Sequence, residues 1–343
     1  MAAIDRRELL QAGAAALAAG AFSRIGFAQA APKIRIDAYS RTLHWLRKPE
    51  EVADACHQIG NMTIDLTVRT YPGHVDPAKV TTDLPPFVKA LERSGITVTV
   101  LGADINDDKT PYIEEMLGTA SSLGIRYNWW RGFNFDSTKP YPPQIEALKP
   151  RLERLVKLEE KYGMKAMYHP QGGPMFDQLE LIRNFDPRYV SLHFDTGHWI
   201  QISQSNMAAM IMLAAPYVGG FVWKDAVVEK HDPAADAPAA GGRAGGVGGA
   251  PGGGGGRGRG GSVNGWGTRQ VPVGTGMVDF ALAARTLKLI NFDGPTECQP
   301  EWTGLGGAES GRDTLTLPRE TVIGLLKRDY DTIHAALTAA GLA

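Results

Sequence analysis

The chain has 343 residues, of which 43% are hydrophobic and 21% are charged, and its formal net charge is -1. This composition is typical of a globular protein, and the length suits one large domain or two ordinary ones. The near-neutral charge gives the whole molecule no electrostatic affinity for nucleic acid or for an anionic membrane.

The first 30 residues have the pattern of an export signal. Arg6 and Arg7 precede a run of small apolar residues, and an A-x-A cleavage pattern ends at Ala30. The apolar run is too short and too weakly hydrophobic to span a membrane. We therefore expect a twin-arginine signal peptide over residues 1–30 and a periplasmic or otherwise exported protein. An amphipathic N-terminal helix is the alternative.

From residue 33 onward, short β-like runs alternate with helical patterns. Strands are predicted at residues 34–39, 62–68, 97–103, 125–131, 165–169, 190–195, 218–224 and 294–299. Helices are predicted at residues 49–59, 78–94, 110–123, 143–162, 176–185, 204–215, 277–290 and 318–340. Eight such pairs predict an α/β protein with a single (β/α)8 TIM barrel over residues 33–340. The first strand is not followed by the G-x-G-x-x-G motif of a dinucleotide-binding sheet.

Residues 233–262 interrupt this alternation with a glycine-rich, low-complexity sequence. Such a composition cannot bury a core, so we expect a disordered loop inserted after the seventh strand. Its RGRG piece is similar to nucleic-acid-binding tracts, but the segment has few arginines and no aromatic residue. A plain insertion is therefore the favoured interpretation. The two cysteines, Cys56 and Cys298, are expected to be buried free thiols.

Polar residues gather where the predicted strands end, which is where TIM barrels carry their chemistry. In strand order they are Arg69 and His74; Asp104; Trp129, Trp130 and Arg131; Tyr168, His169 and Gln171; Asp195 and His198; Lys224 and Asp225; and Glu297, Gln299 and Glu301. Any one of them has an ordinary structural explanation, such as a helix cap. Their concentration at one end of several strands predicts a functional site.

Five segments in chain order carry a resemblance to a known family. They are "AMYHPQGG", "HFDTGH", "VWKDAVVEK", "VPVGTGMVDF" and "GPTECQPEW". Together they resemble the xylose isomerase-like TIM barrel superfamily of sugar phosphate isomerases and epimerases, over essentially residues 33–340. The resemblance implies a (β/α)8 barrel, a divalent metal ion, and chemistry on polyols, keto-sugars or their glycosides.

The resemblance also assigns roles to individual residues. It matches Asp195 with the metal-binding aspartate and His198 with a substrate-binding histidine. On the last strand, Pro300 cannot donate to the ladder, so the strand should end there and Glu301 should lie nearer the rim than Glu297.

Two positions depart from the family pattern. His169 stands where many members carry a metal-binding glutamate, and Val222 stands where many carry a histidine. The expected metal ligands are His169, Asp195 and Glu301, and His198, His74 or Gln171 could complete the set. Imidazole and carboxylate ligands suit Mn, Fe, Co or Zn, and the departures leave an altered metal or none as alternatives.

The expected reaction is proton abstraction next to a carbonyl, with Glu301 or His169 as the base and His198 and Lys224 orienting substrate oxygens. Further substrate-binding residues are expected to be Arg69, His74, Trp129, Trp130 and Gln171. The product would be that of an isomerase or epimerase, or of a related lyase or dehydratase. Export favours a neutral sugar, keto-glycoside or polyol as the small-molecule substrate.

Two other functions remain at this point. A non-catalytic carbohydrate-binding barrel is favoured by Val222 and His169, which weaken the metal site. A DNA-repair endonuclease of the related barrel type would need many more zinc ligands than the eight histidines allow, and a basic face. We therefore expect no nucleic-acid partner and no membrane span. Barrels of this superfamily are often dimers or tetramers, which leaves a homo-oligomer open.

Overall fold

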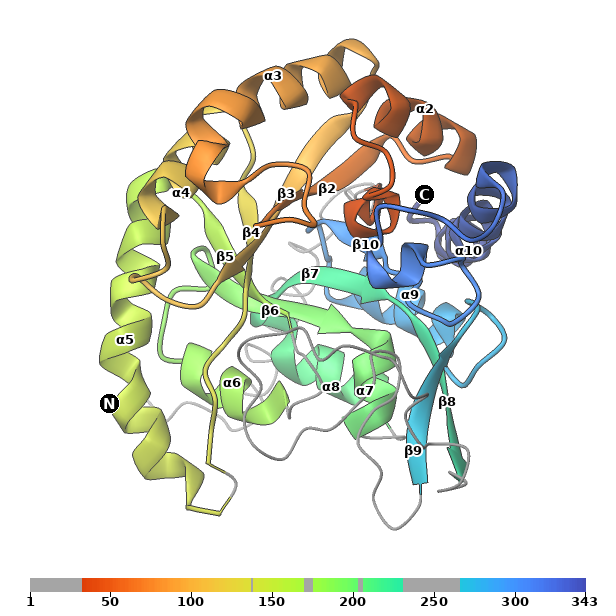
Figure 1. The fold of residues 1–343 in the computed structure, drawn as a ribbon. Helices are drawn as coiled ribbons and strands as arrows, with labels where there is room; N and C mark the ends of the chain where they lie inside the picture. Colours follow the sequence, from red (N-terminus) through yellow and green to blue (C-terminus); the bar gives the residue numbers. More distant parts are fainter. Residues whose placement is uncertain (1–32, 137, 170–174, 203–205, 231–265) are drawn as a thin grey trace, which may run out of the picture. The chain divides into compact units, whose positions relative to one another are not determined.

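The computed structural model describes residues 33–136, 138–169, 175–202, 206–230 and 266–343 (Figure 1). The predicted signal peptide, the predicted glycine-rich insertion and Gln171 lie outside these described residues. The described residues form one TIM barrel, as the sequence predicted.

The barrel wall consists of parallel strands in the closed order β1-β10-β7-β6-β5-β4-β3-β2. Their bounds are Ile36–Ala38 (β1), Thr63–Val68 (β2), Thr97–Ile105 (β3), Tyr127–Trp130 (β4), Lys165–Tyr168 (β5), Val190–Asp195 (β6), Val218–Trp223 (β7) and Thr296–Cys298 (β10). Each lies at a predicted strand. The first strand pairs with the last, with Asp37 opposite Glu297, and this pairing closes the ring.

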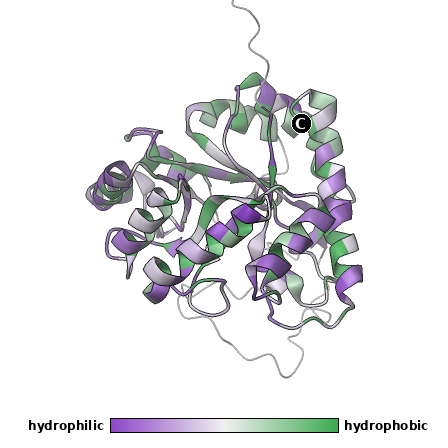
Figure 2. Cartoon of the chain, turned by 90° about the horizontal axis from the view of Figure 1, so that it is seen from above, coloured by the Kyte–Doolittle hydropathy of each residue, from purple (hydrophilic) through white to green (hydrophobic). Residues whose placement is uncertain are grey.

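Helices surround the wall and cover its outer face (Figure 1). Their bounds are Pro49–Ile59 (α2), Val80–Arg93 (α3), Ile113–Ser122 (α4), Tyr141–Tyr162 (α5), Met175–Ile182 (α6), Met207–Ala214 (α8), Phe280–Leu289 (α9) and Arg319–Ala340 (α10). Most of these helices mix hydrophobic and hydrophilic residues (Figure 2), because one face packs on the strands and the other meets solvent, whereas α8 consists of methionine, alanine, isoleucine and leucine only. Pro150 lies inside α5.

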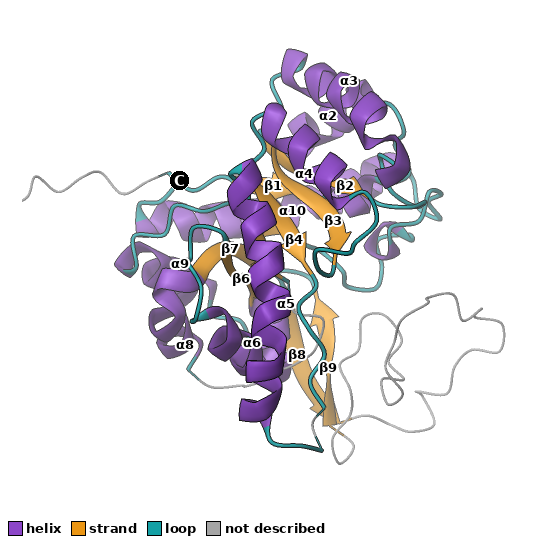
Figure 3. Ribbon diagram, turned by 90° about the vertical axis from the view of Figure 1, so that its left-hand side faces the viewer, coloured by secondary structure: helices purple, strands orange, loops and turns teal. Residues whose placement is uncertain are grey.

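One α-helix and one two-stranded ribbon were not predicted. Helix α7, Thr196–Ile202, begins directly after β6, so His198 lies in a helical turn and not in a loop. Strands β8, Asp225–Lys230, and β9, Trp266–Val271, form an antiparallel ribbon beside the barrel strands (Figure 3). This ribbon flanks residues 231–265, which contain the predicted insertion.

Asp225 has a structural role at the base of this ribbon. Its Oδ2 accepts hydrogen bonds from the backbone N–H groups of Gly274 (2.9 Å) and Gly276 (2.7 Å), and its Oδ1 accepts one from Val278 (3.1 Å). The carboxylate therefore holds the "VPVGTGMVDF" turn in place.

The interior of the barrel is filled by side chains that alternate along the strands. On β6, Phe194 faces the helices and stacks on Phe221, while His193 faces inward, 3.6 Å from Glu297 on β10. Gly220 on β7 makes room for that imidazole, since a Cβ at this position would lie 2.7 Å from His193 Cδ2.

Cys56 and Cys298 are both buried and free, as predicted. Within the described ranges, none of the helices combines the length and the apolar character that crossing a membrane requires.

Candidate active site

Asp195 is the last residue of β6, and its carboxylate organises the turn that follows. Its Oδ1 accepts a hydrogen bond from the backbone N–H of His198 (2.9 Å), and its Oδ2 lies 3.2 Å from the Nδ1 of the same residue. Gly197 is required between them, because a Cβ there would lie 2.7 Å from the Cβ of Lys224. The sequence "DTGH" therefore places an imidazole beside a fully buried carboxylate at the barrel rim.

His169 follows the end of β5 and faces the same point. It is buried, and its Nδ1 has no hydrogen-bond partner among the described residues. Its ring stacks on Trp129 with centroids 5.3 Å apart and meets His198 edge-on at 5.9 Å. One ligand atom each from His169, Asp195 and His198 can be chosen so that all three lie within 4.8 Å of one another.

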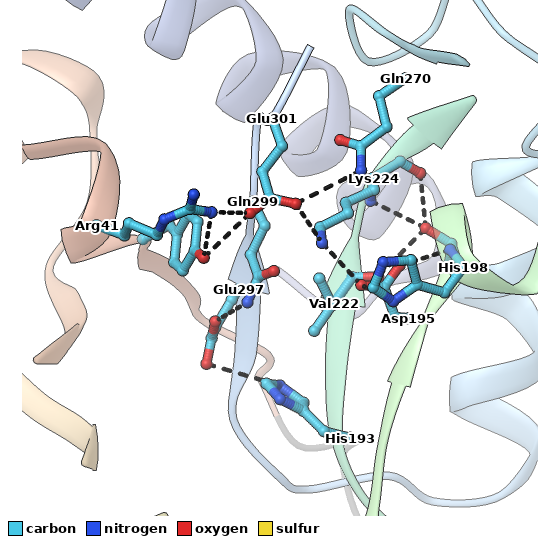
Figure 4. A network of polar contacts seen from close by, with 12 residues as sticks. Arg41, His193, Asp195, His198, Val222, Lys224, Gln270, Glu297, Gln299 and Glu301 are labelled. Atoms are coloured by element: carbon cyan, nitrogen blue, oxygen red, sulfur yellow. Dashed lines mark hydrogen bonds and ion pairs between the residues drawn. The ribbon is translucent and has the colours of Figure 1, made fainter. Parts of the chain in front are cut away.

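Lys224 follows β7 and connects Asp195 to Glu301 (Figure 4). Its Nζ lies 3.0 Å from Asp195 Oδ2 and 3.0 Å from Glu301 Oε2. The ammonium group is almost completely buried between the two carboxylates. This arrangement keeps Glu301 out of the group of three ligand atoms.

Glu301 is surrounded by donors from several elements. Its Oε1 accepts hydrogen bonds from Arg41 and from the hydroxyl of Tyr39 (3.2 Å). On the other side, Gln270 of β9 lies 3.5 Å from its Oε2, beside Lys224 (Figure 4). The β8–β9 ribbon thus contributes one side chain to the site.

The charged groups of this cluster determine one another's protonation states. Burial alone would raise the pKa of Glu301, but Lys224 and Arg41 outweigh it and hold that pKa well below its usual value. Burial likewise opposes the charge of Lys224, yet Asp195 and Glu301 raise its pKa. Burial would raise the pKa of Asp195, and the charges of His198 and Lys224 lower it overall. The two carboxylates are therefore ionised and the lysine is protonated at neutral pH.

His169 is held in its neutral form. Burial, with Lys224 and His193 as further causes, holds its pKa well below the usual value. A neutral imidazole has a lone pair that can bind a metal ion or accept a proton.

A second polar group lies deeper in the barrel. Glu297 is fully buried, and it accepts hydrogen bonds from Gln299 (2.6 Å) and from the indole N–H of Trp129 (3.1 Å). Burial raises its pKa well above the usual value, with the charges of Asp65 and Asp37 adding to the effect. The structure thus places Glu301, and not Glu297, beside Lys224 at the rim.

The residues present fit a divalent metal ion. Two imidazoles and one carboxylate converge, and the buried Nδ1 of His169 has no competing partner in the described structure. This donor set suits Zn, Fe, Co or Mn. Two of the three expected ligands, His169 and Asp195, belong to this group. His198 is its third member, while the oxygens of Glu301 are engaged by Arg41 and Lys224. Val222 is buried in register between Asp195 and Glu297 and offers no ligand.

Only some of the predicted substrate-binding residues face the site. Arg69 and Trp129 face the site, with the guanidinium carbon 5.0 Å from the centre of the indole. Trp130, the next residue on β4, faces outward, is fully buried and packs against Phe133 and Tyr168. The contacts of His74 are with Thr67, His44 and Phe87, away from Asp195.

Sequence reasoning missed three residues that contact Glu301: Tyr39, Arg41 and Gln270. Tyr39 directly follows the first strand, so the argument from strand ends could have included it. Arg41 lies in a short 3-10 helix, Ser40–Leu43, and carries no motif. Gln270 reaches the site through the ribbon that was not predicted.

Comparison with known proteins identifies the family. The model of the xylose isomerase-like TIM barrel family matches residues 53–320, so the chain belongs to this family. A sequence search of curated proteins gives no match.

Solved structures with the same fold include several named for sugar chemistry. An L-ribulose 3-epimerase is 14% identical, covering 90% of this chain and 95% of that chain with a TM-score of 0.56. A 3-keto-D-glucoside 4-epimerase from E. coli is 13% identical, covering 87% of this chain and 100% of that chain with a TM-score of 0.56. The IOLI protein with a bound zinc atom is 15% identical, covering 88% and 99% of the two chains with a TM-score of 0.58.

Proposed function

We propose that this protein is a metal-assisted isomerase or epimerase that acts on a sugar, keto-sugar, keto-glycoside or polyol by removing a proton next to a carbonyl. The observation that carries the proposal is the position of Lys224 between Asp195 of the potential metal-binding group and the ionised carboxylate of Glu301. The family, and the epimerases among its structural relatives, support the same class of reaction.

His169, Asp195 and His198 would hold the metal ion. When bound, the ion would polarise the substrate carbonyl as a Lewis acid. The chain's own residues supply the remaining steps.

Lys224 is placed to stabilise the negative charge that develops on the substrate oxygen. Its ammonium group is buried and stays protonated, and a charged donor in a site of low dielectric stabilises an oxyanion strongly. The group also needs no large movement, because it already lies at the centre of the cluster.

Glu301 is the proposed base. It is ionised, it lies outside the proposed ligand set, and its side chain keeps 19% of its exposure. Its basicity is low while Lys224 and Arg41 both donate to it. A substrate oxygen that takes the Lys224 hydrogen bond would remove one of these partners and raise the proton affinity of Glu301 where it is needed.

The fate of the proton decides the product. Return of the proton to the neighbouring carbon gives isomerisation. Return of the proton to the opposite face of the same carbon gives epimerisation. Loss of a β-leaving group instead of reprotonation gives the lyase or dehydratase variant of the same chemistry.

Proton abstraction can be tested without knowing the product. The protein is incubated in deuterated water with a panel of ketoses and keto-glycosides, and exchange next to the carbonyl is followed by proton NMR. We expect exchange with at least one substrate, and its loss in Asp195→Asn and Glu301→Gln but not in Asp331→Asn, a surface control on α10. Undiminished exchange in both site variants would refute the proposed site.

A carbohydrate-binding barrel without catalysis is the second candidate. It is favoured by Val222, which offers no ligand, and by the full set of donors around Glu301. Sugar affinity that a chelator leaves unchanged, with no deuterium exchange in any substrate, would support this function instead.

We also propose that the protein acts after export by the twin-arginine pathway, on the basis of Arg6, Arg7 and the cleavage pattern at Ala30. Replacing both arginines by lysine should retain the protein in the cytoplasm. Fractionation that finds the variant in the periplasm would refute the export route.

A further inference from the structure

Two arginines share one carboxylate at the rim, next to the proposed metal-binding group. Arg131 follows β4 and donates from its Nε to Asp104 Oδ1 (2.8 Å), with a second contact from the same guanidinium. Arg69 follows β2, and its Nε lies 3.5 Å from the same oxygen. Asp104 keeps 51% of its side-chain exposure, so this ion pair lies at the mouth of the barrel.

Arg69 is poorly compensated in this arrangement. Its side chain is only 15% exposed, and its buried Nε makes no hydrogen bond in the described structure. Burial lowers its pKa, Asp104 opposes this effect, and the nearby charge of Arg131 lowers it further. A guanidinium in this position gains from an additional anionic partner.

Cationic side chains outnumber carboxylates among the groups that form ion pairs around Arg69 and Lys224. Leaving the histidines aside, four cationic side chains pair with three carboxylates. The cations are Arg41, Arg69, Arg131 and Lys224, and the carboxylates are Asp104, Asp195 and Glu301. This local excess contrasts with the net charge of -1 on the whole chain.

Stacked rings connect the arginine pair to the proposed reaction centre. The guanidinium of Arg69 lies over Trp129, and Trp129 stacks on His169. A ligand anchored at Arg69 would therefore extend across the indole toward His169 and Asp195.

We propose that Arg69 and Arg131 bind a carboxylate of the substrate, so that the substrate is a sugar acid and not a neutral sugar. The inference rests on the proposed function and refines its substrate class. Arg131 already donates to a planar carboxylate, Asp104, and the Nε of Arg69 lies beside the same oxygen without a hydrogen bond, so a second carboxylate would supply the acceptor that Arg69 lacks. This inference differs from the neutral substrate expected from the sequence, and the following test distinguishes the two.

The test compares matched acid and neutral ligands. Dissociation constants are measured by calorimetry for D-fructuronate against D-fructose and for D-glucuronate against D-glucose, with D-fructose 6-phosphate as the phosphate arm. We expect at least one acid to bind about tenfold or more tightly than its neutral partner, as charged hydrogen bonds of this kind imply.

Variants locate the effect. Arg69→Gln and Arg131→Gln should each reduce the acid preference, taken as the ratio of the acid and neutral dissociation constants of the same variant, to about unity. Arg69→Lys keeps the charge but loses the planar fork, so it should retain only part of the preference. Arg188→Gln is the matched control, since Arg188 lies in the exposed turn before β6, at the other end of the strand from Asp195, and pairs with Asp186.

The outcomes separate this inference from the proposed function. Acid preference that depends on Arg69, without deuterium exchange in any substrate, supports the inference and contradicts the proposed reaction. Deuterium exchange of neutral keto-sugars without any acid preference supports the proposed reaction and contradicts the inference. Absence of acid binding, preference for the sugar phosphate, or an acid preference unchanged in Arg69→Gln and Arg131→Gln overturns the inference.

Discussion

The Nζ of Lys224 lies 3.0 Å from Oδ2 of Asp195, on the carboxylate that the metal-binding group also uses. The same ammonium lies 3.0 Å from Glu301. A buried cation thus links the proposed Lewis-acid site to the proposed base, and loss of its charge should disturb both.

Replacing Lys224 by methionine should leave two buried carboxylates without their common partner. We expect a fall in kcat of about 100-fold or more, because the developing oxyanion loses its donor. The free energy of unfolding should fall by roughly 3–5 kcal/mol, as when one partner of a buried ion pair is removed. Steady-state kinetics and urea unfolding measure the two effects. Lys327→Met, in an exposed pair with Asp331, should change neither, and a Lys224→Met enzyme with unchanged kcat would contradict the assigned role.

Glu301 should remain a carboxylate well below the pH at which glutamates ordinarily protonate. Because Lys224 and Arg41 hold its pKa below the usual 4.5, despite its burial, kcat/KM should not fall at that pH through protonation of Glu301. Arg41→Gln removes one of these cations, so its acidic limb should move to higher pH. pH–rate profiles of the two proteins provide the comparison, and coincident acidic limbs would argue against Glu301 as the base.

Metal content tests the ligand set independently of activity. Elemental analysis of the purified protein should find about one Zn, Fe, Co or Mn ion per chain. Single changes of His169, Asp195 or His198 to alanine should each reduce that content strongly, whereas Glu301→Gln should retain the ion. Loss of metal from Glu301→Gln with retention in His198→Ala would restore the ligand set that the sequence predicted.

Asp37 should make stability depend on pH. Burial raises its pKa to about 7 from 3.8, although hydrogen bonds from Thr63 and Thr99 lower it. Between about pH 4 and pH 7 the folded protein keeps a proton that the unfolded chain has lost, so stability from this group falls as pH rises. Asp37→Asn should therefore gain stability relative to the wild type across that range, by up to about 4 kcal/mol, and no further above it. Urea unfolding at several pH values measures the difference, and a constant difference would show that Asp37 does not titrate there.

The fold was predictable because its signals are local. Each barrel strand is a short β-rich run followed by an amphipathic helix, and the alternation alone predicts the closed barrel. The β8–β9 ribbon was not predicted because residues 231–265, which include the low-complexity segment, separate its two strands in the sequence. Neither strand therefore has its pairing partner nearby in the sequence.

The candidate site was predictable only in part. The ends of β5, β6 and β7 gave His169, Asp195 and Lys224, because parallel strands bring their carboxyl ends to one rim. The choice between His198 and Glu301 as third ligand depends on the contacts that Glu301 makes with Lys224 and Arg41. Arg41 and Glu301 are 260 residues apart, and no local pattern indicates their contact.

That long-range contact crosses the seam at which the barrel closes. Arg41 follows β1 and Glu301 follows β10, the two strands whose pairing closes the ring. A chain that ended before β10 would contain Lys224 and all three proposed ligands, yet its proposed base would be missing. The proposed activity would therefore report that the barrel has closed, and two fragments divided within the chain should show it only when they reassemble along this seam.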